Sequence, residues 1–178
     1  MGKRINDRAY FYIRRGNRKR IRYLLGKHPY LCTSDEAMLA FLAIWLNRGM
    51  LRWLLERGVS PDGRLGKNGN TPLMQAASEG DCEVMELLLE FGADPNAINE
   101  HSENPLGFAV SWNQLDAIRI LVTAGADIND TTDSGPEKTQ LDWAELSGWT
   151  EGADLLRSLG AKRHVELISS SVSPDAAR

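Results

Sequence analysis

The sequence predicts an all-α fold in which short helix–turn–helix units stack side by side. Three observations lead to this fold class. Apolar residues recur at the i, i+3, i+4 spacing of an amphipathic helix, as in Val84, Leu87 and Leu88. Glycine follows each such run, where a residue without a Cβ can end a helix in the left-handed conformation. The whole pattern returns after 33 residues, from Pro72 to Pro105, which indicates a repeat protein.

Residues 70–96 form the unit on which the other assignments depend. Thr71 and Pro72 predict a helix start, because a Thr hydroxyl caps the first backbone N–H groups and Pro fits the first helical position. Gly80 predicts the end of this first helix, and Gly92 predicts the end of a second helix that follows it. The same pattern elsewhere predicts first helices at about 72–79, 105–112 and 139–147, and second helices at about 82–90, 115–124 and 151–159.

The next copy of this unit stays in register with it. The two copies share their helix start and their loop, and the matching residues are Pro72 with Pro105, Leu73 with Leu106, Ala76 with Ala109, and Gly92-Ala93-Asp94 with Gly125-Ala126-Asp127. This period and the Thr-Pro-Leu opening of residues 71–73 resemble the ankyrin repeat. The resemblance is strong over about 66–163 and weak over about 5–62. It implies a solenoid of about five helix-turn-helix repeats whose terminal repeats are degenerate caps.

The repeats follow one another within a domain of residues 1–165. The first repeat lacks the Thr-Pro-Leu opening, as expected of a terminal repeat that has a neighbour on one side only. The fifth carries two extra residues, which we place between 134 and 138. Residues 166–178 are expected to be a disordered tail, because those from about Ser169 onward are small and polar. The five expected repeats span residues 5–29, 34–62, 66–98, 99–131 and 132–163.

The charge of the chain is unevenly distributed. Residues 1–27 contain ten Lys or Arg and one Asp, whereas the remaining residues carry a net charge of −12 within a total of −3. The basic patch consists of Arg14, Arg15, Arg18, Lys19 and Arg20. It could contact nucleic acid, serve as a nuclear localisation signal, or form the solvated face of a capping helix. We favour a solvated face or a patch for an acidic partner, because no groove of stacking aromatic residues is indicated.

The composition is that of a folded globular domain, with 42% hydrophobic and 25% charged residues. The longest apolar run, 38–46, is far shorter than the roughly 20 residues that a membrane-spanning helix needs. Cys32 and Cys82 fall in different repeats and form no disulfide framework. We therefore expect a monomer in a reducing compartment, the cytoplasm or, in a eukaryote, the nucleus, with no cofactor and no membrane association.

Catalysis finds little support in the sequence. His28, His101 and His164 lie in three distant loops, and no H-E-x-x-H motif, paired C-x-x-C motif or glycine-rich phosphate loop occurs. Asp94 and Asp127 occupy turns, where their carboxylates suit hydrogen bonds from nearby backbone N–H groups. We expect the protein not to be an enzyme, with no catalytic residues and no metal site.

The resemblance implies a binding surface instead, because loop tips and first helices of ankyrin repeats line a concave groove that holds a protein partner. We expect a non-enzymatic protein-interaction module that acts as an inhibitor, an immunity-type factor or an adaptor for a partner that the sequence does not identify. Association of nucleic acid or another polyanion with the basic N-terminal repeat is the alternative. By register, the partner-binding residues are Lys67, Asn68, Asn70, Glu100, His101, Glu103, Glu137 and Lys138 on loop tips, and Trp45, Ser78, Glu79, Ser111 and Trp112 on first helices.

Two tryptophans stand just before the helix-ending position, a site that is usually polar in ankyrin repeats. For Trp45, which lies in a degenerate repeat, we favour packing against the neighbouring repeat. For Trp112, which lies in a well-formed repeat, we favour exposure to a partner, since Trp is over-represented at binding hot spots. Trp53 and Trp143 are expected to pack inside the fold, and the sequence leaves the exposure of Trp149 open.

Overall fold

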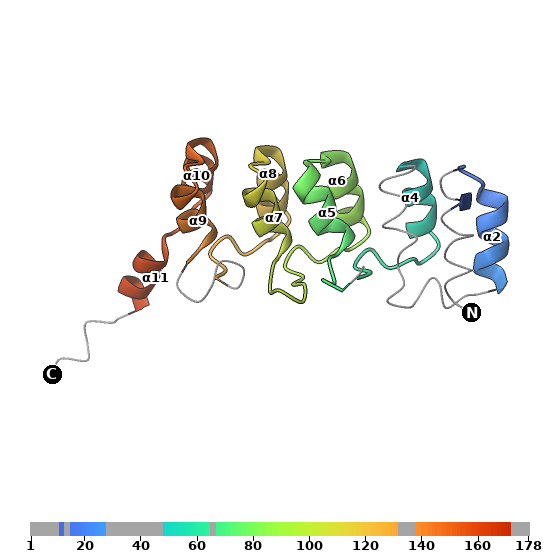
Figure 1. Ribbon diagram of the computed structural model, residues 1–178, viewed down its shortest axis with the longest axis horizontal. Helices are drawn as coiled ribbons and strands as arrows, with labels where there is room; N and C mark the ends of the chain where they lie inside the picture. The colour runs from blue at the N-terminus through green and yellow to red at the C-terminus, as the bar shows by residue number, and fades with distance from the viewer. Residues whose placement is uncertain (1–10, 13–14, 28–47, 65–66, 132–137, 172–178) are drawn as a thin grey trace.

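The computed structural model describes residues 11–12, 15–27, 48–64, 67–131 and 138–171 and shows helices stacked in a row (Figure 1). The helices are α2 (Arg18–Lys27), α4 (Arg48–Leu55), α5 (Pro72–Glu79), α6 (Cys82–Glu90), α7 (Pro105–Ser111), α8 (Leu115–Thr123), α9 (Gln140–Leu146), α10 (Thr150–Ser158) and α11 (His164–Ser171). The predicted all-α class is confirmed. No helix in the described ranges is long and apolar enough to cross a lipid bilayer.

Helices α5 to α10 form consecutive antiparallel pairs, one pair for each of the third, fourth and fifth repeats (Figure 1). The first helices α5, α7 and α9 contact one another along one row, and the second helices α6, α8 and α10 contact one another along a parallel row. Every one of these helices lies within one residue, at each end, of the range predicted from the sequence. Helices α2 and α4 stand where the second helices of the first two repeats were expected.

Local signals set the first-helix starts, as predicted for Thr71, and Asn104 takes the same role in the fourth repeat. The side-chain oxygens of Thr71 and Asn104 accept the backbone N–H of Met74 at 3.3 Å and of Gly107 at 2.8 Å, respectively. Thr139 does the same for the first helix of the fifth repeat. These contacts satisfy N–H groups that have no partner within the helix, so each first helix begins at a defined residue.

Gly80 ends α5 in the left-handed region, with φ 67° and ψ 25°. A Cβ at this position would also lie only 2.4 Å from Oε1 of Gln114, a residue of the next repeat. The Gln114 amide in turn donates to the backbone carbonyl of Ser78 at 3.2 Å. Glycine is therefore required here both for the turn and for the approach of the fourth repeat to the third.

The core repeats with the same period as the sequence. One leucine of each first helix and one of each second helix occupy equivalent positions in the three repeats, and all six are at most 2% exposed. Those on the first helices are Leu73, Leu106 and Leu141, and those on the second helices are Leu88, Leu121 and Leu156. Fully buried alanines accompany them on the first helices, at Ala76, Ala109 and Ala144. Each buried leucine contributes about 1.5–3 kcal/mol of hydrophobic stabilisation, and the helices that bury them contact one another both within and between repeats.

Hydrogen bonds between successive loops fix the spacing of the repeats. The Asn96 side chain accepts the backbone N–H of Asp127 at 2.8 Å and donates to the carbonyl of Gly125 at 3.0 Å. Asn129 accepts the N–H of Lys162 at 2.8 Å in the same way. Asp94 and Asp127 accept N–H groups within their own turns, as the sequence predicted. The loops therefore form a continuous ladder along one edge of the stack.

The C-terminal segment differs from its prediction. Residues 166–171 belong to helix α11 and not to a disordered tail, so that expectation is wrong for this part of the chain. Composition alone suggested disorder, whereas tertiary contacts anchor the segment: the backbone N–H of His164 donates to Asp142 at 2.8 Å, and Leu167 is half-buried. Of the expected first helices of the first two repeats, the structure describes only residues 11–12 and Arg15, and residues 28–47 lie outside the described ranges.

Candidate functional site

The candidate site is the first-helix face, which we define as the exposed sides of α5, α7 and α9 together with the loops that precede them. Side chains on this face fall into register rows from the third to the fifth repeat, and these rows are Gln75, Phe108 and Trp143; Ser78, Ser111 and Leu146; and Glu79, Trp112 and Ser147. The face is polar on α5 and becomes apolar on α7 and α9. Its largest exposed side chains are Leu146, Trp112 and Trp143, at 67%, 65% and 38% exposure.

Trp112 is exposed, as predicted. It is the residue that caps α7, and its backbone N–H donates to the carbonyl of Phe108 at 3.2 Å. The backbone is thus fixed while most of the indole remains in solvent. A large rigid side chain held in this way loses little conformational entropy when a partner covers it, which is why Trp is frequent at binding hot spots.

The other tryptophans divide between confirmed and corrected predictions. Trp53 is 9% exposed in the core, and the guanidinium of Arg57 lies 3.9 Å from its ring centroid. Trp143 was expected to pack inside the fold, but it is exposed, because Leu141 and Ala144 take the buried side of α9. Trp149 is half-buried against the core. Trp45 lies outside the described residues, as do Arg14 and Glu137.

Buried Asn99 organises the loop tips, and sequence reasoning missed it. Its side-chain amide donates to Asn70 and to the Glu103 carboxylate, both at 2.7 Å. Its carbonyl oxygen accepts the backbone N–H groups of His101 at 2.8 Å and Glu103 at 2.9 Å. The sequence does place this polar residue between two predicted loop-tip residues, Asn70 and Glu100. Its hydrogen-bond partners, however, come from two repeats and are brought together only by folding.

The predicted loop-tip residues of the third and fourth repeats lie together. The backbone N–H of Glu100 donates to the carbonyl of Asn68 at 2.9 Å, which joins the two loops. Asn70 and Glu103 are half-buried. The remaining described residues of the predicted loop-tip set are exposed, and they are Lys67, Asn68, Glu100, His101 and Lys138. On the first helices, Glu79 and Ser111 are exposed and Ser78 is half-buried.

A small hollow of about 100 Å³ opens on this face beside α7. It is lined by a carboxylate, two aromatic rings and small residues, namely Glu103, Gly107, Phe108, Ser111 and Trp112. Gly107 lines the hollow with its backbone, since it has no side chain. Phe108 was not among the predicted site residues, although its position four residues before Trp112 places both on one helix face.

The equivalent place in the fifth repeat holds an ion-pair cluster. Arg163 Nε lies 3.2 Å from Asp142 and 3.4 Å from Glu145. Burial of Asp142 works to raise its pKa, but hydrogen bonds from Thr139, His164 and Arg163 outweigh burial and hold the pKa of this carboxyl below its usual value. Asp142 is therefore an ionised group of the cap, already neutralised by the chain's own arginine.

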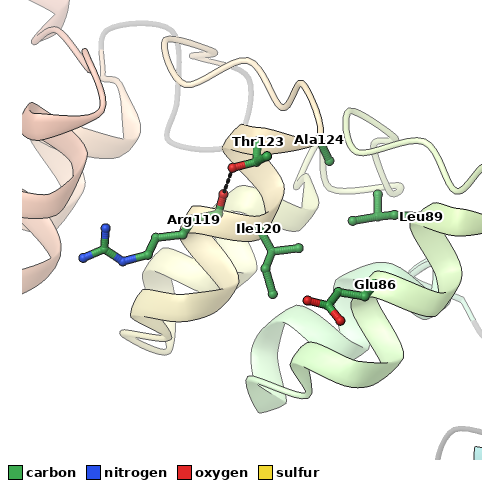
Figure 2. Close-up of a pocket in the computed structure, with 6 residues that line it drawn as sticks. All are labelled: Glu86, Leu89, Arg119, Ile120, Thr123 and Ala124. Carbon is green, nitrogen blue, oxygen red and sulfur yellow. Dashed lines mark hydrogen bonds between the residues drawn. The ribbon is translucent and has the colours of Figure 1, made fainter.

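The opposite side of the stack carries a shallow apolar groove of about 370 Å³ between the second helices α6 and α8 (Figure 2). Figure 2 shows Ile120 pointing toward Glu86 across this groove and Arg119 pointing away from it. The Thr123 hydroxyl is used within α8, where it donates to the carbonyl of Arg119 at 2.8 Å. No convergent polar groups give this groove a binding chemistry of its own.

The basic patch is exposed wherever the structure describes it. Arg15, Lys19 and Arg20 lie in solvent, and the Arg18 guanidinium also donates to the backbone carbonyl of Gly49 at 3.4 Å. Arg15 stacks 4.4 Å from the ring centroid of Phe11. Within the described ranges, no three His, Cys, Asp or Glu side chains gather in a way that could hold a metal ion.

Comparison with known proteins places the chain among repeat proteins. A family model described as ankyrin repeats (3 copies) matches residues 41–132. Alpha-latrocrustotoxin-Lt1a of Latrodectus tredecimguttatus is 29% identical over 147 residues, 80% of this chain and 10% of that protein. The transient receptor potential cation channel subfamily A member 1 homolog of Caenorhabditis elegans is 33% identical over 70% of this chain and 10% of that protein. Human ankyrin repeat and SOCS box protein 16 is 31% identical over 56% of this chain and 22% of that protein. The chain thus spans only about a tenth to a fifth of these relatives' length.

Proposed function

Because the chain belongs to the ankyrin-repeat family, we propose that it is a protein-interaction module that binds one protein partner through the first-helix face. Repeats of this family typically serve as non-catalytic interaction modules. The role that follows is occupation of a partner's surface, as an inhibitor, an immunity-type factor or an adaptor. The relatives' names describe much longer proteins and do not decide among these roles.

The exposure of Trp112 is the observation that carries this proposal. Leu146 and Trp143, on the first helix of the next repeat, are also exposed, so large apolar side chains lie in solvent on two adjacent first helices. Exposed apolar patches rimmed by polar residues mark interaction surfaces in folded proteins. The rim here is polar and mainly acidic, through Glu79, Glu100 and Glu103. The arrangement supports a partner with an apolar anchor flanked by basic groups.

Differential capture tests the proposal. The full chain, tagged at its C-terminus, is used to capture proteins from its source organism in three forms: wild type, Trp112→Ala, and Arg119→Ala on the opposite side of the stack. We expect a protein that is captured by wild type and by Arg119→Ala and lost with Trp112→Ala. A protein lost only with Arg119→Ala would place the interaction on the second-helix side and refute the proposed site.

We infer further that the chain acts as a monomer in a reducing compartment, the cytoplasm or nucleus. Cys82 is a free thiol in this structure, and it is half-buried. Burial, together with the nearby acidic residue Asp116, raises the pKa of the Cys82 thiol, so the reactive thiolate is disfavoured. This supports a packing role for Cys82 and gives no reason to expect an intermolecular disulfide.

Association with a polyanion through α2 is a second candidate function. This helix contains no acidic residue, and its exposed side chains include Arg18, Lys19, Arg20, Arg22 and the 55% exposed Tyr23. The test is binding of a labelled single-stranded oligonucleotide. Binding that weakens steeply with salt would support this function, because phosphate contacts release counterions. Loss of binding in the double variant Lys19→Ala with Arg22→Ala would support it as well. Binding that is independent of these two residues would exclude this helix as the site.

A further inference from the structure

The hollow beside α7 combines a carboxylate with an exposed aromatic face. One Glu103 oxygen, Oε2, accepts the Asn99 amide at 2.7 Å, which holds the carboxylate in place. The other oxygen accepts no hydrogen bond from the described residues. Trp112, 65% exposed, and half-buried Phe108 form the aromatic side of the same hollow. The site is therefore preorganised to receive a group that is positively charged and can lie against a ring.

The charge of Glu103 is not neutralised within the described part of the chain. Its carboxylate is absent from the ion pairs that the described residues form. On the same face, exposed Glu79 and Glu100 add negative potential and exposed Lys67 and Lys138 oppose it, so the unpaired carboxylate of Glu103 is the local charge that a ligand in the hollow meets. A cationic ligand is thus favoured electrostatically over a neutral or anionic one.

The chain pairs an arginine with carboxylates at two places of its own, and at the first of them the arginine also lies near an aromatic ring. Arg52 donates to both oxygens of Glu90, at 3.1 and 2.9 Å, while its guanidinium lies 5.8 Å from the ring centroid of Phe91. In the fifth repeat, Arg163 forms ion pairs with Asp142 and Glu145 beside α9, at the position that corresponds to the hollow of the fourth repeat. The fourth repeat has the carboxylate and the aromatic rings, but no described arginine fills the position.

We propose that this hollow receives an arginine side chain from the partner, with the guanidinium paired to Glu103 and stacked on Trp112. The inference rests on the proposed function, since it names the residue type by which the partner is anchored. Arginine fits better than lysine because its planar guanidinium both stacks on an aromatic face and donates in a fork to a carboxylate. The about 100 Å³ of space accommodates the end of one side chain and no more.

A small-molecule titration tests the hollow without the partner. The probe is N-acetyl-arginine N-methylamide, added to the ¹⁵N-labelled full chain while the indole N–H resonances are followed by NMR. Its control is N-acetyl-citrulline N-methylamide, which has nearly the same shape and no charge. A Trp112→Phe variant identifies the Trp112 resonance by its disappearance. We expect that resonance to shift and saturate with the arginine probe at about 1–20 mM, and not to move with the citrulline probe.

Two glutamate variants locate the charge. Glu103→Gln keeps an oxygen that can accept from Asn99 and should weaken the arginine probe by about fivefold or more. Glu86→Gln, on the second-helix side, should leave the titration unchanged. Any one of three results would overturn the inference. These are equal shifts with both probes, no saturable shift of the Trp112 resonance up to about 50 mM of the arginine probe, and a titration that is unchanged by Glu103→Gln. Capture of a partner that depends on Trp112 would survive any of these results, so the inference and the proposed function fail separately.

Discussion

Asp62 accepts the backbone N–H of Asp94 at 3.0 Å, across the junction between the second and third repeats. Asn96 and Asn129 make the equivalent contact at the next two junctions. The acceptor at the first junction is therefore a carboxyl group, whereas the acceptors at the other two are side-chain amides. Burial raises the pKa of Asp62, and the nearby Asp94 carboxylate adds to the increase, while the hydrogen bond from Asp94 and the charge of Arg64 oppose it. The ionised form of Asp62 is thus disfavoured in the fold.

Replacement of Asp62 by Asn should therefore stabilise the protein at neutral pH. A carboxyl whose folded pKa is raised favours folding below its unfolded pKa of 3.8, and this contribution is lost as the pH rises through the folded value. The amide keeps the acceptor and removes the charge. We expect the free energy of unfolding to rise by up to about 1 kcal/mol at pH 7, with the advantage vanishing near pH 4.

Urea unfolding of Asp62→Asn and wild type over this pH range measures the effect. Asn96→Asp is the reciprocal variant and should lose stability at pH 7, with partial recovery on acidification. A stability difference between Asp62→Asn and wild type that does not change with pH would show that ionisation of Asp62 plays no part.

Asp142 should have the opposite pH signature. Its folded pKa is lowered, so its contribution to stability is present above the unfolded pKa of 3.8 and is lost as the pH falls through the folded value. Asp142→Asn should reduce the free energy of unfolding by about 1–2 kcal/mol at pH 7, and the difference should shrink below about pH 4.

Asp154→Asn is the matched control, because Asp154 also pairs with an arginine but its side chain is 77% exposed. Exposed pairs of this kind contribute less than about 1 kcal/mol, so this variant should be close to wild type at every pH. Equal effects of the two substitutions would mean that the hydrogen bonds in the cap do not set the role of Asp142.

Leucine truncation tests the repeat core. Leu88 and Leu121 are fully buried at the same register, and replacing either with Ala should lower the free energy of unfolding by about 2–5 kcal/mol. Leu146→Ala removes the same atoms from a side chain that is 67% exposed and should change stability by less than about 0.5 kcal/mol. Chemical denaturation measures all three, and a loss below about 1 kcal/mol for Leu88→Ala would contradict the register.

The sequence predicted helix boundaries well because their determinants are local. Thr71 with Pro72 starts a helix and Gly80 ends one through contacts within a few residues of each position. The Asn99 network could not be predicted, since its partners come from two loops that meet only in the folded stack. Helix α11 was missed for the same reason, because it is held by a tertiary hydrogen bond from His164 to Asp142.

The candidate site was predicted in part. Trp112 was expected to be exposed because it lies in a well-formed repeat at a position that is usually polar in ankyrin repeats, and the structure places it in solvent. Trp143 was wrongly assigned to the core, since hydrophobicity alone does not tell which side of an amphipathic helix a tryptophan occupies. Phe108 gained its relevance only from the hollow that it shares with Glu103 and Trp112.

The central claim is that the first-helix face binds the partner, and calorimetric titration of the captured partner tests it most directly. The Kd is measured for wild type, for Trp112→Ala and for Arg119→Ala, with unfolding curves to show that each variant is folded. We predict that Trp112→Ala raises the Kd by about 30-fold or more, equivalent to about 2 kcal/mol, while Arg119→Ala leaves it unchanged. An unchanged Kd for folded Trp112→Ala, with weaker binding by Arg119→Ala, would contradict the account.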